Sequence, residues 1–160
     1  MGVAERSREH VETKLEELEE TYGSFAVKQT TITLPGEQYT SMRERGNPDP
    51  VAAYIAVTND EGAVLHVDGE DEPELPGVEV GLGESLEPAV REQVRREADV
   101  DCVVDGVEQV TIAGLRHGDD PNAETLYNLV VVFSGERREG APADGAIWRQ
   151  LDGDLQPAYA

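Results

Sequence analysis

The sequence has one cysteine, two lysines and no long hydrophobic run, and each shortage excludes a class of protein. Cys102 is the only cysteine in 160 residues, so no disulfide forms within the chain and stability must come from packing. The longest unbroken apolar run, residues 51–57, is far shorter than the roughly 20 residues that a membrane-spanning helix needs. We therefore expect a cytoplasmic protein with neither a membrane span nor a secretion signal.

Positive charge is scarce throughout the chain. The sequence has 13 Lys plus Arg against 34 Asp plus Glu, which gives a formal net charge of -21. This charge repels phosphate backbones and anionic lipid heads, so we expect neither duplex nucleic acid nor a membrane as a partner. The acids are spread over the whole chain and only Lys14 and Lys28 are lysines. The composition resembles that of cytoplasmic proteins of extreme halophiles and predicts a halophilic archaeal source; an ordinary acidic protein is the alternative.

Apolar residues at helical spacing predict a helix over residues 3–22, which ends at Gly23. We expect residues 1–23 to form an N-terminal helical arm and residues 24–160 to form one domain. The apolar stripe of the arm either covers part of the domain or forms a short homodimer seam; it consists of Val11, Leu15, Leu18 and Tyr22.

The rest of the chain reads as strands and turns around one further helix. Proline, glycine and asparagine predict a long loop over residues 35–50. A helix is expected over residues 85–98, with Leu86, Val90 and Val94 on its apolar face. Strands are expected at residues 25–34, 51–58, 63–67, 109–116, 126–134 and 146–151, the second and third forming a hairpin. This order of elements predicts an α+β domain with a mixed sheet.

One segment, LPGVEVGLGESLEPAVREQVRREADV at residues 75–100, joins a glycine-containing loop to this amphipathic helix. It resembles the signature of the Nudix hydrolase family, Gx5Ex7REUxEExGU, in which U is aliphatic. Without gaps, four of its nine defined positions agree, namely Glu84, Val94, Glu97 and Val100. The resemblance extends over the flanking strands and implies a Nudix-like α/β/α sandwich with a mixed sheet, preceded by the N-terminal helix.

The other five defined positions of this box depart from the signature; they are occupied by Val78, Glu92, Gln93, Arg96 and Asp99. The resemblance implies a metal-dependent hydrolase of a nucleoside diphosphate linked to another moiety, with Mg²⁺ or Mn²⁺ held by box glutamates. Positions 93, 96 and 97 share a helix face, where three glutamates would give a charge of -3. Here Gln93, Arg96 and Glu97 sum to zero, and Glu92, four residues before Arg96, is expected to form an ion pair with it. The alternative is a non-catalytic nucleotide-binding or protein-interaction module without a cofactor.

The resemblance also implies roles for single residues. Glu97 would be a metal ligand and, with Glu84, a catalytic residue. The structural alternatives are a salt bridge from Glu97 to an arginine and a helix-terminal hydrogen bond of Glu84. We expect Arg116, Gly77 and Arg96 to contribute to binding a nucleotide-like substrate.

A second group of polar residues lies in a predicted loop between two strands. Asp119, Asp120 and Glu124 follow Arg116 and His117. An arginine and a histidine beside acids can bind phosphate and transfer a proton. These acids either compensate for the missing box glutamates or form a solvated acidic loop.

Overall fold

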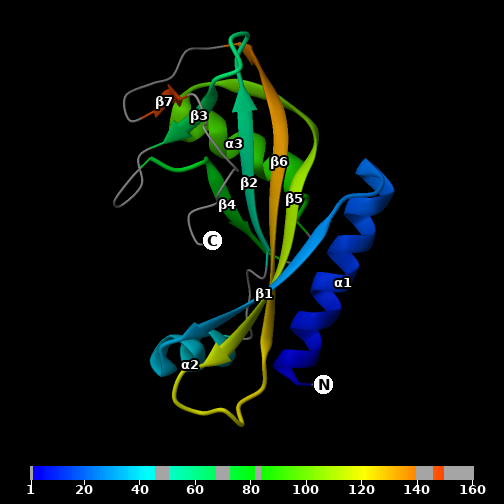
Figure 1. The fold of residues 1–160 in the computed structure, drawn as a ribbon, viewed down its shortest axis with the longest axis vertical. Coiled ribbons are helices and arrows are strands. Elements are labelled where there is room, and N and C mark those ends of the chain that lie inside the picture. Colours follow the sequence, from blue (N-terminus) through cyan, green and yellow to red (C-terminus); the bar gives the residue numbers. More distant parts are fainter. Residues whose placement is uncertain (1, 46–50, 68–72, 82–83, 140–145, 150–160) are drawn as a thin grey trace. The chain divides into compact units, whose positions relative to one another are not determined.

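The computed structural model describes residues 2–45, 51–67, 73–81, 84–139 and 146–149 (Figure 1). Its elements are α1 (Val3–Tyr22), β1 (Val27–Leu34), α2 (Gly36–Glu44), β2 (Val51–Thr58), β3 (Val64–Val67), β4 (Gly77–Val80), α3 (Leu86–Ala98), β5 (Asp101–His117), β6 (Leu126–Glu139) and β7 (Ala146–Arg149). None of the described helices combines the length and apolar character that crossing a bilayer requires.

The strands pair in the order β1-β5-β6-β2-β3-β7, and β4 pairs with β2. The sheet is mixed, as the sequence predicted, because β1 runs parallel to β5 whereas β3 runs antiparallel to both β2 and β7. Both β5 and β6 are longer than predicted, and β4 was not predicted at all. The last two residues of the strand expected at 146–151 lie outside the described residues.

The chain divides into two compact units. The first consists of Met1–Ala52, Glu79–Gly83 and Gln109–Val131, and the second of Ala53–Val78, Glu84–Glu108 and Val132–Ala160. The long strands β5 and β6 contribute residues to each unit. Helix α1 belongs to the first unit, together with β1 and α2. The division into an arm at 1–23 and a domain at 24–160 stays a prediction.

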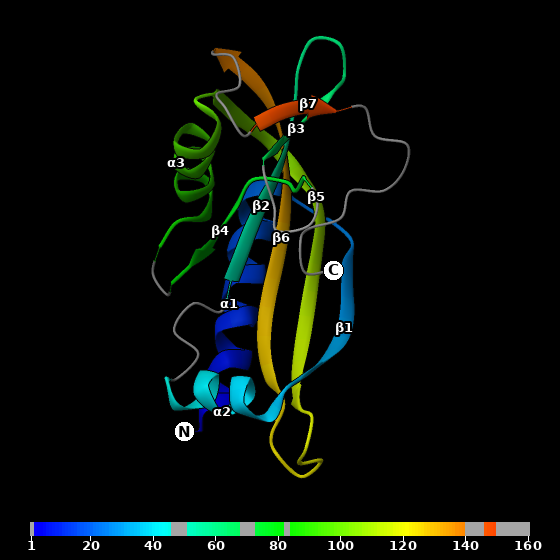
Figure 2. The same cartoon turned by 90° about the vertical axis from the view of Figure 1, so that its left-hand side faces the viewer.

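Helix α1 of the first unit is partly buried along its apolar stripe. Val11 and Leu18 are buried, as the spacing predicted. The Ser7 hydroxyl accepts a hydrogen bond of 3.0 Å from the backbone N–H of Tyr127 on β6. Val3 and Ala4 contact a buried cluster whose members are Tyr39, Ala113, Leu115 and Leu126. Figure 2 shows the first turns of α1 beside α2.

Helix α2 corrects the loop predicted over residues 35–50, of which 46–50 lie outside the described residues. The carbonyl of Pro35 accepts the N–H of Tyr39 at 3.0 Å and closes the first turn. Tyr39 is only 1% exposed, and Met42, three residues later, packs against the same cluster. Short helices depend on tertiary packing for their stability, so burial of these two side chains outweighs the weak helix propensity of the segment.

The second unit contains the predicted hairpin of β2 and β3. Its turn is closed by Asn59, whose Oδ1 accepts hydrogen bonds of 3.0 Å from the N–H groups of Glu61 and Ala63. Gly62 has φ +80°, a conformation that glycine adopts without steric cost. Strand β7 pairs with β3, with Trp148 opposite Leu65. Helix α3 buries the predicted face of Leu86, Val90 and Val94, together with Ala98.

Candidate functional site

Helix α3 carries five of the nine box positions, 92, 93, 94, 96 and 97, and begins at Leu86, one residue after the predicted start. It ends at Asp99, which is the position of the final glycine in the box. Asp99 has φ 55° and ψ 37°, and its N–H donates to the Arg95 carbonyl at 3.1 Å. This left-handed conformation is common at the end of a helix and favours glycine. The glycine that the signature has at this position is therefore explained by the backbone conformation. Asp99 is the only described non-glycine residue with positive φ.

The polar side chains of α3 are bonded to each other. The Arg96 guanidinium donates to the Glu92 carboxylate at 2.7 Å, which confirms the predicted helix pair. The Gln93 amide donates to Glu97 Oε1 at 2.6 Å. Glu97 is half-buried, and its described hydrogen-bond partner is Gln93 rather than an arginine.

These residues do not fit the divalent cation that the resemblance implies. Such a cation needs several oxygen ligands and a local excess of negative charge. One oxygen of Glu97 is engaged by Gln93, and the adjacent Arg96 places a positive charge on the same face. Glu84 is exposed in the segment that precedes α3. Within the described part of the chain, no three acidic, histidine or cysteine side chains are grouped so that they could hold a metal.

Two further arginines of α3 attach the helix to β5. The Asp101 carboxylate lies 3.1 Å from Arg95 and 3.5 Å from Arg91. The hydrogen bond from Arg95, with a smaller contribution from Arg91, holds the pKa of Asp101 below its usual value. Burial raises the pKa of the neighbouring Cys102 thiol to about 11.

Gly77 lies at the start of β4, directly against an aromatic ring of β2. A Cβ atom at this position would lie 2.3 Å from Cδ1 and 2.6 Å from Cε1 of Tyr54. The absence of a side chain therefore lets the two strands approach each other around the ring. This contact gives Gly77 a packing function that the sequence did not predict.

In the first unit, Arg116 lines a hollow of about 660 Å³ on one face of β1, β5 and β6. Gln29, Thr31, Gly114, Thr125 and Tyr127 are among the other lining residues. The parallel register places Thr31 beside Gly114 and Thr33 beside Arg116. Arg116 is exposed and Gly114 adds no side chain, so the hollow combines one guanidinium with hydroxyl and amide groups.

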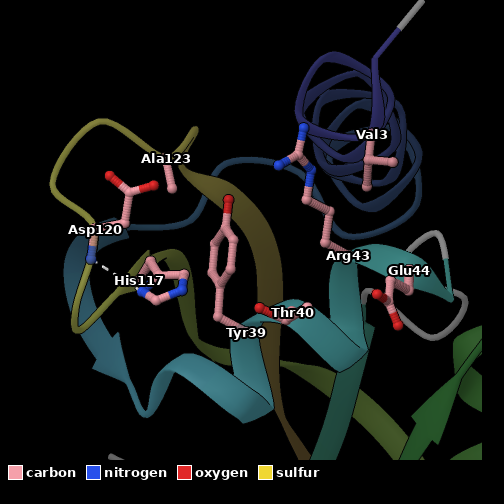
Figure 3. A pocket seen from close by; sticks show the side chains of 8 residues that line it. All are labelled: Val3, Tyr39, Thr40, Arg43, Glu44, His117, Asp120 and Ala123. Carbon is pink, nitrogen blue, oxygen red and sulfur yellow. Dashed lines mark hydrogen bonds between the residues drawn. The ribbon is translucent and has the colours of Figure 1, made fainter.

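Of the predicted group around His117, only His117 and Asp120 line a second hollow in the same unit, of about 420 Å³ (Figure 3). Asp119 and Glu124 are not among its lining residues. The His117 Nδ1 atom accepts hydrogen bonds of 3.0 and 3.1 Å from the N–H groups of Asp119 and Asp120. A neutral imidazole that accepts at Nδ1 carries its hydrogen on Nε2. The loop therefore fixes one tautomer of His117.

Four residues of this second hollow come from α2 and were missed by the sequence analysis, namely Tyr39, Thr40, Arg43 and Glu44. The Tyr39 ring lies 5.1 Å from that of His117, and its hydroxyl donates to the Glu124 carbonyl. Burial raises the pKa of Tyr39, and Glu124 and Asp120 add to this whereas Arg43 opposes it. The spacing of Tyr39 and Met42 is the signal that could have indicated a helix here.

The sequence matches no model of a protein family and no curated protein, and comparison with solved structures finds likenesses of fold at low sequence identity. UDP-X diphosphatase aligns with a TM-score of 0.50 and 14% identity, over 94% of this chain and 71% of that one. An ADP-ribose pyrophosphatase from Streptococcus suis has a TM-score of 0.48 and 18% identity, over 69% and 80%. A NUDIX hydrolase from Nitrosomonas europaea has 0.46 and 18%, over 64% and 73%. The mixed sheet and helix α1 confirm the expected α+β fold with an N-terminal helix, and the likeness to UDP-X diphosphatase is one of fold.

Proposed function

We propose that this chain binds a nucleoside diphosphate linked to another moiety and does not hydrolyse it with a divalent cation. The observation that carries the proposal is the bonding on α3, where Gln93 engages Glu97 and Arg96 engages Glu92. The hydrolase and the binding module are the two functions that the fold and the box resemblance suggest, and the side chains of the helix favour the module.

Electrostatics supports this choice. Unit charges 4 Å apart interact by about 1 kcal/mol in water and about 4 kcal/mol near a protein surface, and the energy doubles for a divalent ion. Replacing a glutamate by Arg96 turns one such attraction into a repulsion of similar size. Gln93 contributes no charge, so Glu97 is left as one carboxylate beside one guanidinium on this face.

The hollow around Arg116 is our proposed ligand site. A guanidinium is suited to phosphate because it donates parallel hydrogen bonds from a fixed planar group. Tyr127 offers an aromatic ring, and Thr31 and Thr125 offer hydroxyl groups to a sugar. We do not include the predicted binding residues Arg96 and Gly77 in this ligand site, because Arg96 pairs with Glu92 and Gly77 packs against Tyr54.

The test is a ligand-binding assay run beside a hydrolysis assay. UDP-glucose and ADP-ribose are added in 2 M KCl, with either EDTA or Mg²⁺, and the melting temperature and the products are measured. We expect at least one compound to raise the melting temperature equally with EDTA and with Mg²⁺, and no breakdown products. Arg116→Gln should abolish the shift, whereas Arg45→Gln, at an exposed arginine of the same unit, should preserve it.

Two results would contradict the proposal. Release of nucleotide products that requires Mg²⁺ or Mn²⁺ and disappears in Glu97→Gln would show a metal-dependent hydrolase. Absence of any ligand response, together with a dimer that requires α1 in light scattering, would favour the protein-interaction module.

A further inference from the structure

The second hollow, between α2, the start of α1 and the loop that follows β5, carries charges of both signs. Its lining includes the Arg43 guanidinium and the carboxylates of Asp120 and Glu44. In Figure 3, Asp120 and Arg43 lie on opposite sides of the Tyr39 ring. Among the described residues, Arg43 forms no ion pair with an acid, and the one hydrogen bond of the Asp120 carboxylate is to the N–H of Asn122.

The middle of the hollow is held in place by hydrogen bonds. Tyr39 is buried, and its hydroxyl is tied to the Glu124 carbonyl, 85 residues away in the sequence. His117 is fixed by the two backbone donors of the loop. Gly36 lets the imidazole approach α2, since a Cβ there would lie 2.7 Å from His117 Cε1. Because hydrogen bonds hold Tyr39 and His117, the part of the hollow between the two opposite charges is already ordered before a ligand binds. This order lowers the entropic cost of binding.

The charges select among ligand classes. A phosphate group would meet two carboxylates for one guanidinium, so an anion is disfavoured. A ligand with only a positive charge would be repelled by the Arg43 guanidinium, which lines the same hollow. A divalent metal would need several oxygen ligands, and the described residues contain no group of acids, histidines or cysteines that supplies them. A molecule with both charges satisfies each side of the hollow.

We propose that this hollow binds a small zwitterion, with its carboxylate on Arg43 and its ammonium group on Asp120. A volume of about 420 Å³ is at the lower end of the range for small-molecule sites and suits an amino acid. Val3 and Ala123, which are partly exposed, provide apolar surface for the carbon chain between the two charges. This site is separate from the proposed nucleotide site at Arg116 and does not depend on it.

The experiment is calorimetric titration of the full chain in 2 M KCl. The probes are glycine, β-alanine and 4-aminobutyrate, which separate the two charges by increasing lengths, with acetate, methylammonium and inorganic phosphate as comparisons. We expect at least one zwitterion to bind and all three comparison ions to fail. Arg43→Gln and Asp120→Asn should each weaken binding about tenfold or more, because each removes a charged hydrogen bond.

Matched controls are Arg45→Gln, which neutralises a neighbouring exposed arginine, and Asp60→Asn in the exposed turn between β2 and β3. Both should bind the zwitterion as the wild type does. In ¹⁵N-labelled protein, the amide signals of Asp120 and Ala123 should shift on binding while that of Ala53, in the second unit, stays unchanged. The proposal is overturned if no zwitterion binds, if phosphate or methylammonium binds equally well, or if neither charge removal weakens binding.

Discussion

At the scale of single residues, Tyr39 is the residue whose environment differs most from the sequence prediction. The sequence placed this tyrosine in a loop, because nothing nearby indicates that its hydroxyl meets Glu124, 85 residues later. In contrast, the pairing of Glu92 with Arg96 followed from their spacing alone. Contacts within one helix turn could thus be predicted, whereas the members of the second hollow became neighbours only through the fold.

Tyr39→Phe tests this buried hydrogen bond. The change leaves the Glu124 carbonyl without its donor, and we expect a loss of about 1–3 kcal/mol in the free energy of unfolding. Urea denaturation measures the loss. Thr21→Val is the control, since it removes an exposed hydroxyl that donates to the Glu17 carbonyl, where water can replace it. If the two substitutions lower the free energy of unfolding equally, the buried hydrogen bond of Tyr39 contributes no more than an exposed one.

The same residue predicts a pH dependence. The pKa of Tyr39 is 10.0 in an unfolded chain and is raised in the folded protein, chiefly by burial. The folded state therefore retains its proton longer, so the contribution of Tyr39 to stability is complete below pH 10.0 and is lost as pH rises through the folded pKa. The difference in stability between the wild type and Tyr39→Phe should shrink above that pH; a constant difference would contradict this assignment.

At the scale of elements, the sequence was most informative for helices with long apolar stripes. Both α1 and α3 were predicted nearly to their ends, because buried residues recur at helical spacing and Gly23 or Asp99 follows. Helix α2 and strand β4 were missed because they are short and are held by contacts with residues distant in the sequence. Tyr39 and Met42 hold α2, and Gly77 packs β4 against Tyr54. Local periodicity does not reveal elements of this kind.

The end of α3 gives a prediction at this scale. Asp99 adopts a left-handed conformation that glycine adopts without strain, so Asp99→Gly should raise the free energy of unfolding by up to about 1 kcal/mol. Thermal and urea denaturation both measure it. Asp60→Gly, at an exposed turn residue whose φ is not positive, should be neutral or destabilising. If Asp99→Gly destabilises the protein instead, the aspartate side chain stabilises the fold by more than the left-handed backbone conformation costs.

At the scale of the whole molecule, the net charge of -21 dominates. Screening shortens the Debye length from about 10 Å at 0.1 M salt to about 3 Å at 1 M, which weakens repulsion among the acids. We expect the melting temperature to rise by roughly 5 °C or more between 0.1 and 2 M KCl. Replacing Glu9, Glu16 and Glu20 on the exposed face of α1 by glutamine should reduce this dependence. A melting temperature that does not change with KCl concentration would contradict the halophilic interpretation.

The central claim is that the α3 face has lost its attraction for a divalent cation, and Mn²⁺ titration by calorimetry in 2 M KCl tests it most directly. The triple variant Glu92→Arg, Gln93→Glu, Arg96→Glu restores the three charged positions of the signature on α3 and adds one negative charge overall. The control Gln38→Glu on α2 adds the same charge elsewhere. We predict saturable binding of one Mn²⁺ by the triple variant and none by the wild type or Gln38→Glu. Saturable binding of one Mn²⁺ by the wild type that disappears in Glu97→Gln would contradict the claim.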